Sequence, residues 1–263
     1  MKHRLTFTLF LAGALSLQVG PGFAKEPTTL RAAVAERDYP PFYYTDPETG
    51  KLTGLSTDIC DAVAGKLGYR IVNERYPFTR VLNNLDRGES DLACTLFNTR
   101  HRAPGNIYVS VPHAVEEIYA IALTDTLSQL PETSQNKALS GDTLQMTFGG
   151  VRGYYYGTQY IPHLTLYNSD KNLPEALASG RIKIALSNLP TFRWYAAEDD
   201  SIKDNWGTLG PPWYSGAIYM AFSREHPQAE KLAAEFTEAL IEFKQTEEYR
   251  KLLRQYGMNA PDF

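Results

Sequence analysis

An arginine downstream of an aromatic turn is the clearest chemical signal in this sequence. The turn is Asp38-Tyr39-Pro40-Pro41-Phe42, and Arg102 closes the run Thr99-Arg100-His101-Arg102. A planar guanidinium can hold a carboxylate with two parallel hydrogen bonds. The sequence has no hydrolase nucleophile elbow, zinc-protease helix motif or phosphate loop. We therefore expect capture of a small anionic solute, without a cofactor or a metal, rather than chemistry on that solute.

The N-terminus has the features of a secretory signal. A basic start, Lys2-His3-Arg4, precedes the apolar run Leu5–Val19, and the small residues Gly22 and Ala24 stand where a signal peptidase cleaves. We expect residues 1–24 to be a signal peptide and the mature protein to be periplasmic. An uncleaved membrane anchor is the alternative, which the shortness of the apolar run disfavours.

Size and charge narrow the class of partner. Removing 24 residues from 263 leaves 239, enough for two lobes of ordinary domain size. The formal net charge is -4, and loss of Lys2 and Arg4 makes it -6. Proteins that bind nucleic acid need a basic face, so this balance argues against that partner. We expect a monomer that binds a small molecule.

The two cysteines, Cys60 and Cys94, allow two interpretations. Cys60 falls on a predicted helix and Cys94 on a predicted strand of the same lobe. Export to an oxidising compartment permits a disulfide between them. Two buried thiols that act as small hydrophobic groups are the alternative. Neither cysteine has another ligand at metal-binding spacing.

Predicted strands and helices alternate along the mature chain, which is typical of parallel sheets with crossover helices. We expect two α/β lobes, the first from 25–117 and 218–263 and the second from 118–217, with a ligand cleft between them. One continuous sheet would contradict this division. The expected strands cover 30–34, 69–74, 92–96, 115–123, 143–148, 182–186 and 217–222; a turn covers 149–153; the expected helices cover 57–67, 78–87, 154–160, 173–179, 191–198, 228–244 and 247–256.

Short motifs of both lobes follow one another in a specific order. They are Asp38–Phe42, Gly54 with Asp58-Ile59, Leu85-x-x-Gly88-x-x-Asp91, Thr99-x-x-Arg102, Gly153 and Leu177-x-x-Gly180-Arg181. This order resembles the bacterial extracellular solute-binding proteins of family 3, which include the polar amino-acid receptors of ABC transporters. The resemblance implies an α/β, two-lobed periplasmic-binding-protein-like fold (type II). It also implies an inner-membrane ABC permease as partner and an amino acid as ligand.

The same resemblance implies particular ligand-binding residues. Arg102 matches the arginine that clamps the ligand carboxylate, and Arg100 is the competing position. Tyr39 matches an aromatic residue that covers the ligand, and Phe78 lies where another aromatic wall residue is expected. The alternatives are an exposed Arg102, a Tyr39 that only plugs the turn and a Phe78 that belongs to the core.

Further site residues follow from the strand ends. Thr95 and Asn98, at the end of a predicted strand, could hydrogen-bond near the ligand carboxylate. In the second lobe, Tyr154 or Tyr155 matches a family threonine at the start of a helix. Free backbone N–H groups at that helix start would favour an anion.

Two departures from the family pattern concern the ligand's amine. Lys183 and Asn188 stand where acidic residues are usual, and Asn188 matches the position that typically receives the α-amino group. An uncharged amide binds an ammonium more weakly than a carboxylate does. We therefore expect a firm hold on the carboxylate and a weak hold on any amine, unless an acid such as Glu36 compensates. A carboxylate without an amine, or a larger aromatic ligand, fits this expectation.

Two other functions compete with solute delivery. One is a periplasmic enzyme on the same fold, similar to cyclohexadienyl dehydratase, with Glu36 or Glu175 as the acid or base. Neither carboxylate has a convincing partner in the sequence, so we expect a protein that is not an enzyme. The other is a ligand-sensing subunit that reports to a separate membrane kinase.

Overall fold

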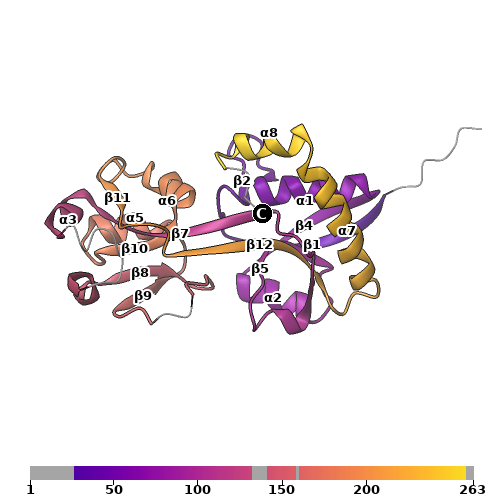
Figure 1. Cartoon of the computed structure of the whole chain (residues 1–263), viewed down its shortest axis with the longest axis horizontal. Coiled ribbons are helices and arrows are strands. Elements are labelled where there is room, and N and C mark those ends of the chain that lie inside the picture. Colours follow the sequence, from indigo (N-terminus) through magenta and orange to yellow (C-terminus); the bar gives the residue numbers. More distant parts are fainter. Residues whose placement is uncertain (1–26, 132–140, 158–159, 259–263) are drawn as a thin grey trace, which may run out of the picture.

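The computed structural model describes residues 27–131, 141–157 and 160–258. The predicted signal peptide, residues 1–24, lies outside the described residues. Figure 1 shows two groups of elements joined by two long strands, β7 (Ala114–Leu123) and β12 (Tyr214–Ser223). The first lobe is drawn mainly in indigo and purple, and the second in pink and orange. Among the described residues, no helix is both long enough and apolar enough to span a bilayer.

The first lobe is a sheet with helices on both faces. Its strands β1 (Thr28–Ala35), β4 (Tyr69–Tyr76) and β5 (Leu92–Phe97) run parallel, as the sequence predicts. Successive side chains of a strand point to opposite faces of the sheet. Ala32 of β1 therefore packs in the core on the side of α1 (Leu55–Lys66), and its neighbour Ala33 packs in the core on the side of α2 (Phe78–Asp86). Three short strands and a 3₁₀ turn complete the lobe: β2 (Tyr44–Thr45), β3 (Leu52–Thr53), β6 (Asn106–Tyr108) and η1 (Ala103–Gly105).

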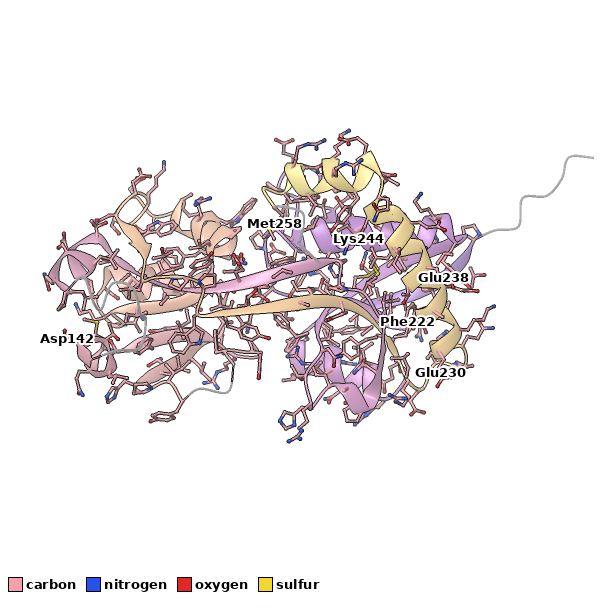
Figure 2. All side chains as sticks on the ribbon, in the orientation of Figure 1. Asp142, Phe222, Glu230, Glu238, Lys244 and Met258 are labelled. Atoms are coloured by element: carbon pink, nitrogen blue, oxygen red, sulfur yellow. A yellow bond between two sulfur atoms is a disulfide. The ribbon has the colours of Figure 1, made fainter. Side chains whose placement is uncertain are left out.

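The C-terminal helices return to the first lobe. They are α7 (Ala229–Lys244) and α8 (Glu247–Gln255). Phe222 of β12 meets Phe236 of α7 at 5.0 Å between ring centroids, and Figure 2 shows Phe222 beneath this helix while Glu230 and Glu238 point outward from it. The apolar face of α7 therefore covers the sheet, as the amphipathic spacing of its sequence predicts.

Cys60 and Cys94 form a disulfide that ties α1 to β5, with 5.9 Å between their Cα atoms. Both side chains are buried in the core of the first lobe. This resolves the two interpretations of the cysteines in favour of the bridge, since helix and strand pack directly against each other.

The second lobe has its own buried clusters around Phe148 and Phe192. Its strands β8, β9 and β10 run parallel to one another, while β11 pairs antiparallel with β7. The bounds are β8 (Phe148–Val151), β9 (Leu164–Tyr167), β10 (Ile184–Asn188), β11 (Trp206–Thr208), α3 (Thr124–Gln129), η2 (Gly141–Gln145), α5 (Asn172–Ala178) and α6 (Leu189–Ala196).

The hydrogen-bonded sheet is continuous from one lobe to the other. Its order is β4-β1-β5-β12-β7-β10-β8-β9, because β7 and β12 pair with each other and with strands of both lobes. The expectation of a break between two sheets is therefore wrong. The two lobes are therefore two groups of elements on one shared sheet. The predicted boundaries, 117/118 and 217/218, fall inside β7 and β12, and the exact residues that divide the lobes stay a prediction.

Two expected elements after the connector differ from the structure. The strand lies at Phe148–Val151 instead of 143–148, so Gly149 and Gly150, which were expected in a turn, belong to β8. A Cβ on Gly149 would lie 2.5 Å from Ile182 Cδ1, so glycine here permits close packing inside the lobe. The expected helix start at 154–160 is not helical over residues 154–157, and residues 158–159 lie outside the described part.

Candidate functional site

A cavity of about 280 Å³ lies between the lobes. The first lobe lines it with the 35–39 segment, Phe78, Thr95 and Arg102, and the second lobe lines it with the 151–154 and 168–170 segments. The carboxyl ends of β1, β5, β8 and β9 all lead into these segments. Ligand sites in α/β folds form at such strand ends. The order of the strands thus brings distant parts of the sequence to one pocket.

Arg102 enters the cavity from the loop that follows β5. Its Nη2 donates to the backbone oxygen of Gly153 in the second lobe at 3.2 Å, and its guanidinium stacks on Phe78 at 5.2 Å from the ring centroid. Burial lowers the pKa of Arg102, although an arginine remains protonated at neutral pH. None of the ion pairs between described residues includes it. The cavity therefore contains a partly buried cation that has no carboxylate partner among the described residues.

Tyr39, Phe78 and Thr95 line the cavity together with Arg102, as their assignment to a ligand site requires. Tyr39 is buried, and its hydroxyl donates to the carboxylate of Glu116. Phe78 faces Gly153, where a Cβ would lie 2.8 Å from the ring and where φ is +89°. Glycine at this position lets the second lobe approach the aromatic wall. These four residues come together as predicted, and their contact with a ligand stays a prediction.

Three other predicted site residues lie outside the cavity lining. Asn98 is exposed. Tyr155 packs edge-on against Tyr214 at 5.1 Å, because the expected helix start is absent and its side chain turns to the second lobe's own aromatic cluster. Asn188 is buried, and its Oδ1 caps α6 by accepting from Thr191 N at 3.3 Å. Its amide serves the helix terminus rather than the cavity.

The two positions at which this chain lacks the usual acidic residue, Lys183 and Asn188, are not placed where the sequence suggests. Lys183 is exposed and Asn188 caps a helix, and neither residue lines the cavity. Glu36, the proposed compensating acid, is an exposed residue that lines the cavity. Glu175 forms a surface ion pair with Arg181 on the outer side of α5.

Asp170 is a cavity residue that sequence reasoning missed. It lies just before α5, is 4% exposed, and accepts hydrogen bonds from Tyr154 at 2.5 Å and Ser187 at 2.9 Å. Burial raises the pKa of Asp170 to about 6, although these two hydrogen bonds oppose the shift. The available signal was an aspartate between a strand end and a helix start, seven residues before the Leu177-x-x-Gly180 motif.

Glu116 is the second missed residue. It lies on β7, is 1% exposed and lines the cavity. Burial raises the pKa of Glu116 well above its ordinary value, and the negative charge of Asp170 raises it further. Its neighbour Glu117 points to the other face of the strand and is exposed, as the alternation of strand side chains requires. The pair Glu116-Glu117 gives no sequence signal for which carboxylate is buried.

The lobes meet through polar contacts beside the cavity. Tyr195 of α6 donates to the backbone oxygen of Asp38 at 3.0 Å, and Thr191 donates to the backbone oxygen of Pro40. Arg37, in the same first-lobe segment, donates to the backbone oxygen of Asn168. The structure is therefore a closed form of the two lobes. Among the described residues, no group of His, Cys, Asp and Glu is placed to hold a metal ion.

Two α/β lobes that close over a charged pocket define a class of proteins that bind small solutes by enclosing them. Residues 31–259 match the bacterial extracellular solute-binding proteins, family 3, and the chain belongs to this family. The fold is the type II periplasmic-binding-protein fold. A comparison with curated proteins found no match.

Solved structures show the same fold at low sequence identity. A histidine kinase sensor domain with similarity to periplasmic binding proteins has a TM-score of 0.73 at 19% identity, covering 90% of this chain and 99% of that chain. An amino acid ABC transporter substrate-binding protein from Streptococcus pneumoniae, bound to L-arginine, has a TM-score of 0.69 at 19% identity, covering 87% and 94%. An ancestral amino acid-binding protein described as a precursor of cyclohexadienyl dehydratase has a TM-score of 0.68 at 17% identity, covering 87% and 94%.

Proposed function

We propose that the protein is a periplasmic receptor that captures a free amino acid and delivers it to an inner-membrane ABC permease. The observation that carries this proposal is the pair Arg102 and Asp170. They bear opposite charges, come from different lobes, line one cavity, and have no charged partner among the described residues.

A zwitterion supplies both missing partners at once. The ligand's carboxylate accepts from the Arg102 guanidinium, and its ammonium donates to the Asp170 carboxylate. Because each protein charge is desolvated, each pairing removes the cost of a buried unpaired ion. Since the two charges belong to different lobes, the ligand also bridges the lobes and favours the closed form. This proposal replaces the expectation of a weak hold on the amine.

Membership of the family supports solute binding, and the likeness to amino-acid receptors supports the fold. The permease, the periplasmic location, the monomeric state and the absence of catalysis belong to the proposal. In it, closure of the lobes creates the surface that the permease recognises.

The test begins with the protein's own ligand. Mass spectrometry of the solute released from the purified, denatured protein identifies candidates. Calorimetry then compares the twenty L-amino acids with their des-amino carboxylic acids, in the wild type and in Asp170→Asn. We expect an amino acid to bind at least tenfold more tightly than its des-amino analogue in the wild type, and this preference to shrink in Asp170→Asn. Binding of des-amino acids alone, or of no amino acid, would overturn the proposal.

Catalysis on the same fold is the second candidate, and the buried carboxyls Glu116 and Asp170 favour it. A carboxyl that holds its proton in a closed cavity has the character of a general acid. Incubation of the recovered ligand with the protein, followed by mass spectrometry, separates the two functions. A receptor returns the ligand unchanged, whereas an enzyme returns a product in excess over the protein.

A further inference from the structure

Two buried carboxyls stand at the two ends of a pair of tyrosines on the cavity wall. The rings of Tyr39 and Tyr154 meet edge to face at 5.1 Å. Tyr39 donates its hydroxyl hydrogen bond to Glu116, and Tyr154 donates its own to Asp170. The first carboxyl comes from the strand that joins the lobes, and the second from the edge of α5. The cavity thus has two separate buried acidic positions, of which the proposed zwitterion uses one.

Glu116 has an oxygen without a partner. Its Oε1 accepts from Tyr39, and no described residue hydrogen-bonds to Oε2. The side chain is 1% exposed and lines the cavity, and no described cation forms an ion pair with it. A buried carboxylate without a counter-charge is strongly disfavoured. Because Oε1 is occupied as an acceptor, the proton of the neutral carboxyl belongs on Oε2.

The charged and titratable groups around Glu116 reinforce this protonated form. The negative charge of Asp170 raises the pKa of Glu116 further, and Glu36 and Asp38, the latter paired with Arg75, are the other acids that line the cavity. The phenols of Tyr154, Tyr156 and Tyr214 also feel the charge of Glu116 and remain neutral at ordinary pH. The cations that line the same cavity are Arg37, Arg102 and Arg152.

We infer that Glu116 is a proton-exchanging specificity residue: it keeps its proton when a ligand with a neutral side chain binds, and it releases the proton to receive a second cationic group. This inference rests on the proposed function, because it presumes that Asp170 holds the α-ammonium. Binding of a basic amino acid then forms one ion pair at Glu116, and one proton passes from Oε2 to the solvent. The pocket therefore distinguishes cationic from neutral side chains through protonation.

The test uses L-arginine and L-citrulline, which have nearly the same shape and differ in side-chain charge. Calorimetry at one pH in two buffers of different ionisation enthalpy counts the protons released. In the wild type we expect about one proton released with arginine and none with citrulline. Between pH 5 and pH 7, arginine affinity should rise by about tenfold per pH unit beyond any change seen with citrulline, as linkage to one proton requires.

Glu116→Gln is the variant that removes the exchange and keeps an acceptor for Tyr39. It should release no proton, and its arginine affinity should fall at least tenfold relative to its own citrulline affinity. Glu117→Gln, on the exposed face of the same strand, is the matched control and should behave as the wild type. Thermal unfolding of each variant verifies that it is folded.

The outcomes separate this inference from the proposed function. Arginine that binds the wild type and Glu116→Gln equally, proton release that persists in Glu116→Gln, or failure of the wild type to bind arginine each overturns the inference. If citrulline or another neutral amino acid still binds in those cases, the proposed function stands. If no amino acid binds, the proposed function fails as well.

Discussion

Arg102 and Asp170 are two charged side chains of the cavity that the rest of the described protein leaves without an ion-pair partner. Each side chain is desolvated, and neither forms an ion pair with another described residue. The hydrogen bonds from Arg102 to Gly153 and from Tyr154 to Asp170 compensate only in part. Such a charge has already lost part of its hydration. Pairing it with a ligand group of opposite charge therefore contributes more binding free energy than pairing a fully solvated residue would.

Replacing Arg102 with alanine should reduce ligand affinity by more than tenfold. The loss of a charge-assisted hydrogen bond in a closed pocket costs about 2–5 kcal/mol, because the ligand's carboxylate is left without a partner. Calorimetry with the identified ligand measures the effect. Arg100→Ala is the matched control, since Arg100 is exposed and does not line the cavity. Unchanged binding in Arg102→Ala would exclude the role of Arg102.

Asp170→Asn should stabilise the ligand-free protein at pH 8 and not at pH 4. The folded pKa of about 6 lies above the ordinary value of 3.8. The unfolded chain therefore ionises more readily, and the native state loses stability as pH rises from about 4 through 6. A shift of two units corresponds to about 3 kcal/mol at high pH.

Urea unfolding of both proteins at the two pH values measures this difference. The exposed Asp204→Asn serves as control and should show no pH-dependent gain. Saturating ligand should reverse the ranking, because only the wild type gains the ion pair. A variant that is less stable than the wild type at pH 8 would contradict the prediction.

At the scale of elements, the sequence predicted most strands and helices. It misplaced one strand, β8, and predicted a helix start at 154–160 that is not helical over residues 154–157. Apolar spacing and glycine stops located α1, α2, α5, α6 and the C-terminal helices, since these signals are local. The strand at Phe148–Val151 was misplaced because its glycines serve close packing, which depends on Ile182 from a distant part of the sequence. Local patterns do not contain that information.

The same limit explains the candidate site. Arg102, Tyr39 and Phe78 stood in recognisable motifs, so the sequence located them in the cavity. Asp170 and Glu116 were missed because their importance comes from burial. Asn188 lies outside the cavity lining because its side chain turns back to cap α6, which its position along the chain does not show.

Removing the disulfide with Cys60→Ala and Cys94→Ala together should lower the free energy of unfolding by about 3–4 kcal/mol. The two residues are 34 positions apart, and a bridge of this span restricts the unfolded chain by that amount. Guanidinium unfolding measures the change. Ligand affinity should be retained, because both cysteines lie in the core of the first lobe and neither lines the cavity. An unchanged unfolding free energy would contradict the prediction.

For the whole molecule, closure depends on contacts as well as on charge. The helix α6 meets the 38–45 segment through Tyr195, Thr191 and a tilted ring contact between Trp194 and Tyr44, whose centroids are 5.1 Å apart. These contacts join residues of different lobes. They stabilise the closed form even without a ligand. The more stable the closed form is on its own, the less ligand binding energy closure requires.

Tyr195→Phe should increase the open population of the ligand-free protein about fivefold. The variant loses one hydrogen bond across the lobes, worth about 1 kcal/mol. Small-angle X-ray scattering should show a larger radius of gyration without ligand and no difference at saturation. Arg193→Ala, an exposed position on the same helix, is the control. An equal radius of gyration in the ligand-free variant and wild type would count against a role for α6 in closure.

The path of the chain through the lobes sets the order in which they can be completed during synthesis. All of the second lobe's elements, from α3 to β11, lie between β7 and β12 in the sequence, so this lobe emerges as one stretch. In the first lobe, β5 pairs with β12, and α7 covers the core beside it. Until those last segments are made, the sheet edge at β5 and the surface that α7 buries stay uncovered. A nascent chain therefore remains without a finished first lobe until nearly all of its residues have been made.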